Sequence, residues 1–307
     1  MGGGRAIVLA TGACVLAATC WAANAIIAAG AFERGVDPGR LAEARVVVAL
    51  VPLAFVLLLT RRDLVRPPRA ALGPLIGFGI SMMVVNWAYY VAIDRVPVGV
   101  AISLQYTAPV LLLVGMAVVT RRFPPGVLWI AGGLTLAGAA LVSGALGAAG
   151  ALDLDGLGLL AGVLSAVSFA GYLLSAELAG RRGSHPVSTL LIGFVVAVVI
   201  WAVVLPMWDW PFGLLSDPEV AWRVLAVGLV GTLLPFALVV AALRLVTSAV
   251  AGIATTTEPV LAAALAWLLL DQSLGAGQLI GGALVVAGVL AAQLTSRSAV
   301  RAPEALA

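Results

Sequence analysis

The stretch YTAPVL at residues 106–111 returns as TTEPVL at residues 256–261, an offset of 150 positions. The same offset maps Gly132 onto Gly282 further along the chain, and it holds over three consecutive apolar segments. A register that is kept over such a distance indicates an internal duplication. We therefore expect two structurally similar halves.

The composition excludes a soluble fold. Of the 307 residues, 63% are hydrophobic and 10% are charged, and the mean hydropathy is +1.15. A soluble domain of this length has too little interior to bury that much apolar surface. Apolar runs of roughly 20 residues, the length that crosses a bilayer core, recur from end to end and leave no room for a sizeable soluble domain.

Gly, Pro, Arg and Asp divide the chain into ten apolar segments. The predicted spans are 6–29, 41–59, 71–93, 96–119, 126–146, 157–179, 187–208, 222–243, 247–270 and 277–294. The first repeat is expected to cover residues 6–146 and the second residues 155–295, followed by a tail at 296–307. Because each repeat has five spans, the second enters the membrane upside down. The predicted fold is thus an all-α integral membrane protein of ten transmembrane helices in two inverted-topology five-helix repeats.

The distribution of arginine predicts the orientation. With the N-terminus inside, the even-numbered loops and the two termini hold most of the 17 basic residues, all of which are Arg. Basic residues collect in cytoplasmic loops. Both termini are therefore expected in the cytoplasm, and the multi-pass protein in the inner (plasma) membrane. The net charge of +3 is read as this topology signal, so no nucleic-acid partner is expected.

Two prolines lie at matching places in the repeats. Pro109 is near the centre of the fourth predicted span, and Pro259 is near the centre of the ninth. Each lacks an N–H group and frees the carbonyl four residues earlier, at Gln105 and Thr255, which is expected to bend the helix. Broken helices at corresponding positions of two repeats point to a transport site near the midplane. A packing kink satisfied by neighbouring Thr hydroxyls is the alternative.

Glu258 lies at the centre of its span. An ionised carboxylate at that depth costs roughly 2.5–3.5 kcal/mol on insertion scales, so the group is expected to be neutral much of the time. This suits a proton-coupling site or a partner for a substrate ammonium group. The structural alternative is a protonated Glu that hydrogen-bonds a neighbouring helix.

Other polar side chains at similar depth are candidates to line a wet cavity with Glu258. They are Asn24, Asn86, Tyr90, Gln105, Tyr106, Tyr172, Thr256 and Thr257. Each alone is more commonly a satisfied hydrogen bond between helices; their gathering in one layer favours the cavity.

Several other polar residues are interpreted without a role in that cavity. Glu43 and Arg45 are expected at the outer membrane interface, where long side chains reach the headgroups. Glu177 is expected to face headgroups, His185 to lie in an inner loop and Asp271 to be solvated. The sequence shows no cluster of metal-ligating side chains, so neither a metal nor a cofactor is expected.

The residues NWAYY at 86–90, VPVGVA at 96–101, LQYTAP at 104–109 and EPVL at 258–261 resemble the EamA-type ten-helix transporters of the drug/metabolite transporter superfamily. Within that family, the pattern is similar to the bacterial threonine/homoserine exporters, which carry an acidic residue where this chain has Gln105. The resemblance covers nearly the whole chain. It implies the ten-helix fold and export of an amino acid or a similar metabolite, in exchange for protons.

Together these features predict a secondary active transporter, a proton-coupled exporter of amino acids or similar small metabolites. An importer or an exchanger of another small solute would have the same fold. A more remote alternative is an intramembrane enzyme, which would need a partner for Glu258 such as a second carboxylate or a histidine. The expected partners are the lipid bilayer, a small-molecule substrate and the proton, and no obligate protein partner is evident.

Overall fold

The computed structural model describes residues 3–96, 98–145, 155–270 and 274–301, and within these residues the regular secondary structure is helical throughout. Nine described segments are long and apolar enough to cross a membrane, and one shorter apolar helix accompanies them. The predicted fold of ten spans is confirmed.

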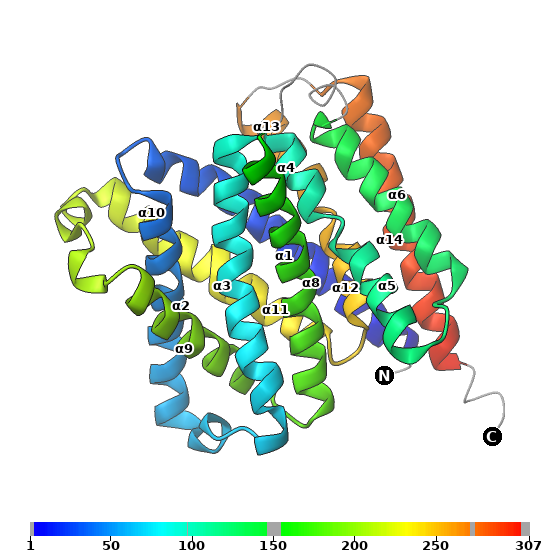
Figure 1. The fold of residues 1–307 in the computed structure, drawn as a ribbon, viewed down its shortest axis with the longest axis horizontal. Helices are drawn as coiled ribbons and strands as arrows, with labels where there is room; N and C mark the ends of the chain where they lie inside the picture. The colour runs from blue at the N-terminus through cyan, green and yellow to red at the C-terminus, as the bar shows by residue number, and fades with distance from the viewer. Residues whose placement is uncertain (1–2, 97, 146–154, 271–273, 302–307) are drawn as a thin grey trace.

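The first half contains five spans, the fourth of which consists of two helices (Figure 1). The bounds are α1 (Gly3–Phe32), α2 (Pro38–Thr60), α3 (Leu72–Arg95), α4 (Val98–Gln105) with α5 (Ala108–Thr120), and α6 (Gly126–Val142). Short 3-10 turns at Arg62–Val65 and Arg69–Ala71 connect α2 to α3.

The second half repeats this plan, with its fourth span again divided. The bounds are α8 (Gly156–Arg181), α9 (Pro186–Val204), α10 (Pro218–Gly228) continued by η5 (Leu229–Leu233) and α11 (Leu234–Ala242), α12 (Ser248–Thr255) with α13 (Glu258–Leu270), and α14 (Ala276–Arg301). The segment η5 is one turn of π-helix. The last helix continues to Arg301, past the predicted end of the tenth span at residue 294.

Helix pairing follows the symmetry of two inverted repeats. The third span packs along the sixth, as α3 on α8, and the eighth packs along the first, as α11 on α1. Exchanging the repeats converts one pair into the other. The fifth and tenth spans, α6 and α14, pack against each other and so form a pair that the exchange leaves unchanged.

The α6–α14 contact brings two backbones together. A Cβ atom at Gly138 would lie 2.5 Å from the carbonyl oxygen of Gly281, and one at Gly281 would lie 2.6 Å from that of Gly138. Small residues allow this close packing in a bilayer, where helices have no hydrophobic drive to associate. Glycine is therefore needed at both positions.

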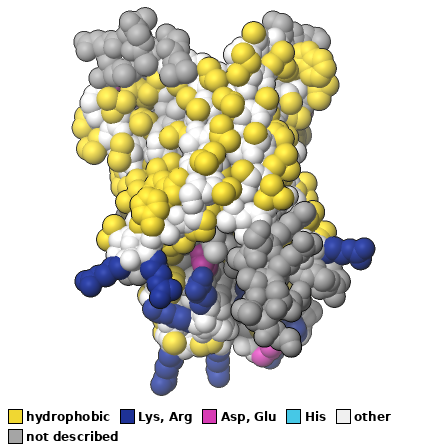
Figure 2. Space-filling model, turned by 90° about the vertical axis from the view of Figure 1, so that its right-hand side faces the viewer, with side chains coloured by type: hydrophobic (Ala, Val, Ile, Leu, Met, Phe, Trp, Pro, Cys, Tyr) yellow, Lys and Arg dark blue, Asp and Glu magenta, His cyan; other side chains and the backbone are white. Residues whose placement is uncertain are grey.

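The surface has the character of a membrane protein. Figure 2 shows hydrophobic side chains over the middle and upper part of one face, and arginines gathered toward the lower end. Large apolar side chains such as Leu160, Ile280 and Leu290 are more than half exposed, far beyond what a soluble protein tolerates over a continuous area. In Figure 1, α1 begins and α14 ends at this same lower end, as an even number of crossings requires.

Candidate functional site

The spans that contain Pro109 and Pro259 are both fully interrupted. α4 ends at Gln105 and α5 begins at Ala108, while α12 ends at Thr255 and α13 begins at Glu258. Each proline follows its break by one or two residues, so it falls in the first turn of the new helix, where a missing N–H group does no harm. The interruption is thus sharper than the expected bend.

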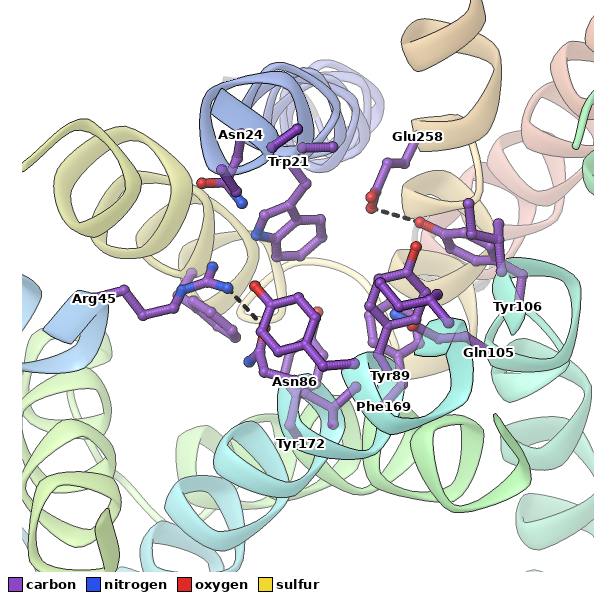
Figure 3. Close-up of a pocket in the computed structure, with 18 of the residues that line it drawn as sticks. Trp21, Asn24, Arg45, Asn86, Tyr89, Gln105, Tyr106, Phe169, Tyr172 and Glu258 are labelled. Carbon is purple, nitrogen blue, oxygen red and sulfur yellow. Dashed lines mark hydrogen bonds between the residues drawn. The ribbon is translucent and has the colours of Figure 1, made fainter. Parts of the chain in front are cut away.

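The two breaks meet in the interior, where they join the repeats through one contact. The hydroxyl of Tyr106 donates a hydrogen bond of 2.5 Å to Oε2 of Glu258 (Figure 3). Tyr106 is 3% exposed, whereas Glu258 is half-buried. Hydrogen bonds to a charged acceptor are short and about twice as strong as neutral ones, so this contact is suited to holding the carboxylate form of Glu258.

Glu258 and Tyr106 line a cavity of about 330 Å³, within the size range of sites for small molecules. Its wall comes from both repeats and includes Trp21, Asn24, Arg45, Asn86, Tyr89, Tyr90, Gln105, Tyr106, Phe169, Tyr172, Phe236 and Glu258. Among the described residues that line it, one is acidic, Glu258, and one is basic, Arg45.

The cavity extends to one end of the bundle and is closed toward the other. Ala28 and Phe32, near the end of α1, and Ile93, near the end of α3, belong to its wall. On the opposite side, the buried rings of Phe78, Tyr172, Phe194 and Phe236 meet edge to face at 5.4–6.3 Å.

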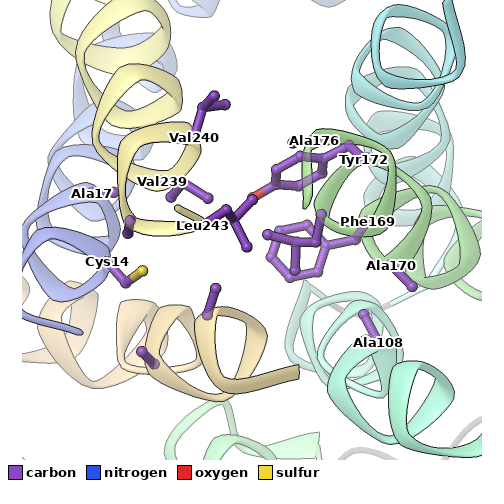
Figure 4. Close-up of a cluster of buried hydrophobic side chains, with 14 of the residues drawn as sticks. Cys14, Ala17, Ala108, Phe169, Ala170, Tyr172, Ala176, Val239, Val240 and Leu243 are labelled. Carbon is purple, nitrogen blue, oxygen red and sulfur yellow. The ribbon is translucent and has the colours of Figure 1, made fainter. Parts of the chain in front are cut away.

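Small apolar side chains complete the closed side. Cys14 and Ala17 of α1, Ala108 of α5 and Ala176 of α8 are buried around Tyr172 (Figure 4). These buried side chains pack beneath the cavity, on the side away from Phe32 and Ile93.

Most of the candidate polar residues share the cavity wall. Asn24, Asn86, Tyr90, Gln105, Tyr106, Tyr172 and Glu258 all lie there. Some are already engaged, since Gln105 Oε1 accepts a hydrogen bond from Ser165 at 3.2 Å. The hydroxyl of Tyr172 is buried and has no hydrogen-bond partner among the described residues.

Thr256 and Thr257 require a correction, because the structure does not bring them to the cavity wall. Both are buried, and their hydroxyls donate to the carbonyls of Gly252 and Ala254 at 2.9 Å. They serve the end of α12, as expected when Thr side chains satisfy carbonyls at a helix break. Pro109 and Pro259 likewise lie outside the wall and act through the breaks that they follow.

Arg45 is a cavity residue that the sequence analysis placed wrongly. It was expected at the membrane interface, yet it is 3% exposed and lies on the cavity wall. Its guanidinium donates to Thr232 Oγ1 at 2.7 Å, Asn86 Oδ1 at 2.8 Å and the carbonyl of Gly231 at 2.7 Å. Asn86 therefore contributes to the site by supporting Arg45.

The π-helical turn explains how this arginine is held. Pro235 cannot donate to the carbonyl of Gly231, four residues earlier, so that oxygen is available to Arg45. Thr232 donates to the carbonyl of Val227, five residues back, at 2.8 Å, and accepts from Arg45. Single π turns inside α-helices are frequent at functional sites. Pro235, near the centre of the predicted span 222–243, was the signal that could have revealed this position.

Other polar residues have structural partners. Glu43, expected at the interface, is fully buried and pairs with Arg40 at 3.0 Å. Glu177, expected among headgroups, is also buried: one oxygen pairs with Arg181 at 2.7 Å and the other accepts from the backbone N–H of Ser248 at 2.6 Å, which anchors the start of α12.

Two further expectations concern loop residues. His185 lies at the N-cap of α9, where its Nδ1 accepts from the backbone N–H of Val187 at 3.3 Å. Asp271 lies outside the described residues. Within those residues, no group of three or more His, Cys, Asp or Glu side chains is placed to hold a metal ion.

Two five-span repeats around a polar cavity, with broken helices at its centre, define a multi-pass membrane transporter of the inverted-repeat class. The chain belongs to the EamA-like transporter family, which it matches twice, over residues 8–144 and 156–293.

Individual relatives agree with this family. The threonine/homoserine exporter RhtA of Escherichia coli (strain K12) is 28% identical over 230 residues, which covers 73% of this chain and 72% of the relative. The protein of the same name from Salmonella typhimurium (strain LT2) is 26% identical over the same length. An uncharacterized transporter of Synechocystis sp. is 28% identical over 213 residues, covering 68% of this chain and 63% of its own length.

A solved crystal structure shares the fold. It superposes with a TM-score of 0.75 and covers 94% of this chain and 98% of its own, at 19% sequence identity. The likeness therefore concerns the architecture of all ten spans.

Proposed function

We propose that this protein is a proton-coupled exporter of amino acids or similar small metabolites, and that Glu258 carries the coupled proton. The observation that carries the proposal is the hydrogen bond from Tyr106 to Glu258, which lies in the cavity where the broken helices of the two repeats meet. Through this hydrogen bond, the titratable carboxyl group of the second repeat is in direct contact with the first repeat. Its protonation can therefore bias how the repeats pack.

Exchange follows from competition for one carboxylate. When Glu258 is ionised, it accepts from Tyr106 and can also bind a substrate ammonium group. When a proton binds, the charge that holds the ammonium is lost and the substrate is released. Since proton and substrate exclude each other, each conformational cycle moves one in each direction, and a proton gradient drives substrate out of the cell.

The relatives support the choice of substrate class. Two of them are named threonine/homoserine exporters, and they match 73% of this chain. The charge of the cavity also suits a small polar solute, because its wall carries one acid, one arginine and several hydroxyl and amide groups.

The orientation is part of the proposal. The arginine-rich lower end in Figure 2 is assigned to the cytoplasm, together with both termini, and the opposite end to the outside. The cavity extends toward that opposite end, so the conformation described here is the outward-facing one.

The test is flux in proteoliposomes that contain Glu258→Gln, which keeps the shape of the side chain and cannot ionise. The substitution is expected to preserve membrane insertion and to abolish proton-driven substrate flux and its pH dependence. Glu43→Gln is the matched control, because Glu43 is also a buried acid in a spanning helix but lies outside the cavity wall. Full flux with unchanged pH dependence in Glu258→Gln would refute the proposal.

Cargo and direction need a second measurement. Cells that overexpress the protein are compared with cells that lack it, by an unbiased survey of metabolites in the medium. An exporter of amino acids is expected to enrich one or a few of them outside the overexpressing cells. Depletion of the same compounds from the medium would instead indicate an importer.

A further inference from the structure

Arg45 is a buried cation without a counter-ion among the described residues. All three of its hydrogen bonds go to neutral acceptors, namely a hydroxyl, an amide oxygen and a backbone carbonyl. No carboxylate of the described residues lies within ion-pair distance of it. Burying an unpaired charge is strongly unfavourable, and in a membrane such a residue marks a functional site.

The guanidinium is also preorganised. Thr232 and Gly231 of η5 hold it from one side and Asn86 of α3 from another, at 2.7–2.8 Å. These contacts use three of its five N–H groups, which leaves one on each Nη atom. These two N–H groups are available to donate to the oxygens of a carboxylate.

The opposite charge stands across the cavity. Figure 3 shows Arg45 on one side and Glu258 with Tyr106 on the other, with Trp21 between them. A neutral solute would leave both charges unsatisfied, and a simple cation or anion would leave one. A molecule that carries both an ammonium and a carboxylate group can pair with both charges, its ammonium with Glu258 and its carboxylate with Arg45.

We infer that Arg45 binds the carboxylate of the transported molecule while Glu258 and Tyr106 receive its ammonium group, so that the substrate is a zwitterionic amino acid with a free carboxylate. This inference rests on the proposed function, and it adds the residue that anchors the second charge. It assigns Arg45 to substrate recognition and the π-helical turn to holding Arg45 in place.

The first experiment uses the unmodified protein. The purified transporter in detergent is screened for thermal stabilisation by the twenty standard L-amino acids. Each compound that stabilises it is then compared with its amino alcohol, in which CH₂OH replaces the carboxylate, and with its 2-hydroxy acid, in which OH replaces the ammonium group. Both analogues are expected to bind roughly 10–100-fold more weakly, as the loss of a hydrogen bond to a charged group predicts.

The second experiment asks whether Arg45 is the origin of that preference. In Arg45→Gln, the affinity for the amino acid is expected to fall to that for the amino alcohol, while the affinity for the alcohol stays unchanged. Arg45→Lys keeps the charge without the fork and should restore part of the preference. Arg223→Gln is the control, because Arg223 lies on α10 outside the cavity wall and pairs with Glu219 at 3.4 Å. A purely structural arginine would weaken acid and alcohol alike.

A further variant keeps the arginine and removes a support. Thr232→Val deletes the acceptor of Arg45 Nε with little change of shape. It is expected to weaken binding of the acid several-fold and to leave the alcohol unaffected, which tests the assignment even if Arg45→Gln does not fold.

The outcomes separate the two proposals. Stabilisation by none of the amino acids would overturn the proposed substrate class and this inference together. Stabilisation by an amino acid and equally by its alcohol would overturn the role of Arg45 alone. An acid preference that persists in folded Arg45→Gln would overturn it as well.

Discussion

Pro235 stands four residues after Gly231 and has no N–H group to donate to its carbonyl oxygen, which accepts a hydrogen bond of 2.7 Å from Arg45. The proline thereby shapes the cavity without lining it. Pro109 and Pro259 also shape the cavity without lining it. Each follows a helix break that exposes a side chain to the cavity, Tyr106 in one repeat and Glu258 in the other.

Pro235→Ala should separate this role from stability. An N–H group at position 235 can donate to Gly231 and compete with Arg45 for its carbonyl. We expect the affinity for the amino acid to fall roughly tenfold, the effect of one weakened hydrogen bond to a charged group, while the melting temperature is unchanged or higher. Pro52→Ala is the control, since Pro52 lies inside α2 and outside the cavity wall. Equal loss of binding in both variants would contradict the explanation.

Gly231→Ala tests the packing of the π-helical turn. A Cβ atom at this position would overlap the side chain of Asn24, whose Oδ1 is buried. We expect a loss of about 1–3 kcal/mol in unfolding free energy from overpacking, together with weaker substrate binding. Thermal unfolding in detergent measures the first effect. Gly12→Ala, in a helix with open space around the glycine, should be neutral or stabilising by up to about 1 kcal/mol.

The fold was predictable because its determinants are local. Apolar runs long enough to cross a bilayer identify the spans one at a time, and the offset between residues 106–111 and 256–261 identifies the repeat without any knowledge of contacts. The breaks could also be located, since a proline affects a carbonyl at a fixed distance along its own helix.

The cavity was less predictable, because its composition depends on which helices face each other. Arg45 looked interfacial from its place near the start of α2, and only the packing of α2 against η5 and α3 buries it. Thr256 and Thr257 looked like cavity residues from their depth, but their short hydroxyls reach the carbonyls of their own helix first. The depth of a residue in the membrane can be inferred from its position within an apolar segment of the sequence. The direction in which its side chain points depends on how the helices pack.

Tyr106→Phe removes the hydroxyl that joins the two breaks and changes little else, since the ring keeps its edge-to-face contact with Phe169 at 5.9 Å. Glu258 then loses a charge-assisted hydrogen bond, for which we expect exchange to slow by roughly 10–100-fold. Counterflow of a labelled amino acid in proteoliposomes gives the rate. Tyr90→Phe is the control on the same cavity wall, and its effect should stay within a few-fold. If the two variants exchange at the same rate, the contact with Glu258 has no part in transport.

Gly281→Ala addresses the contact between α6 and α14, away from the cavity. The added methyl group would lie 2.6 Å from the carbonyl oxygen of Gly138 and 2.9 Å from Cβ of Leu141, so the two helices must move apart. Because neither atom is the flexible end of a side chain, we expect a destabilisation of about 1–3 kcal/mol, seen as a lower melting temperature in detergent. Gly133→Ala, on α6 with open space around it, should not lower it. Neither glycine lines the cavity, so the protein that remains folded should bind substrate with unchanged affinity. A loss of affinity in Gly281→Ala would mean that the contact between α6 and α14 helps to set the shape of the cavity.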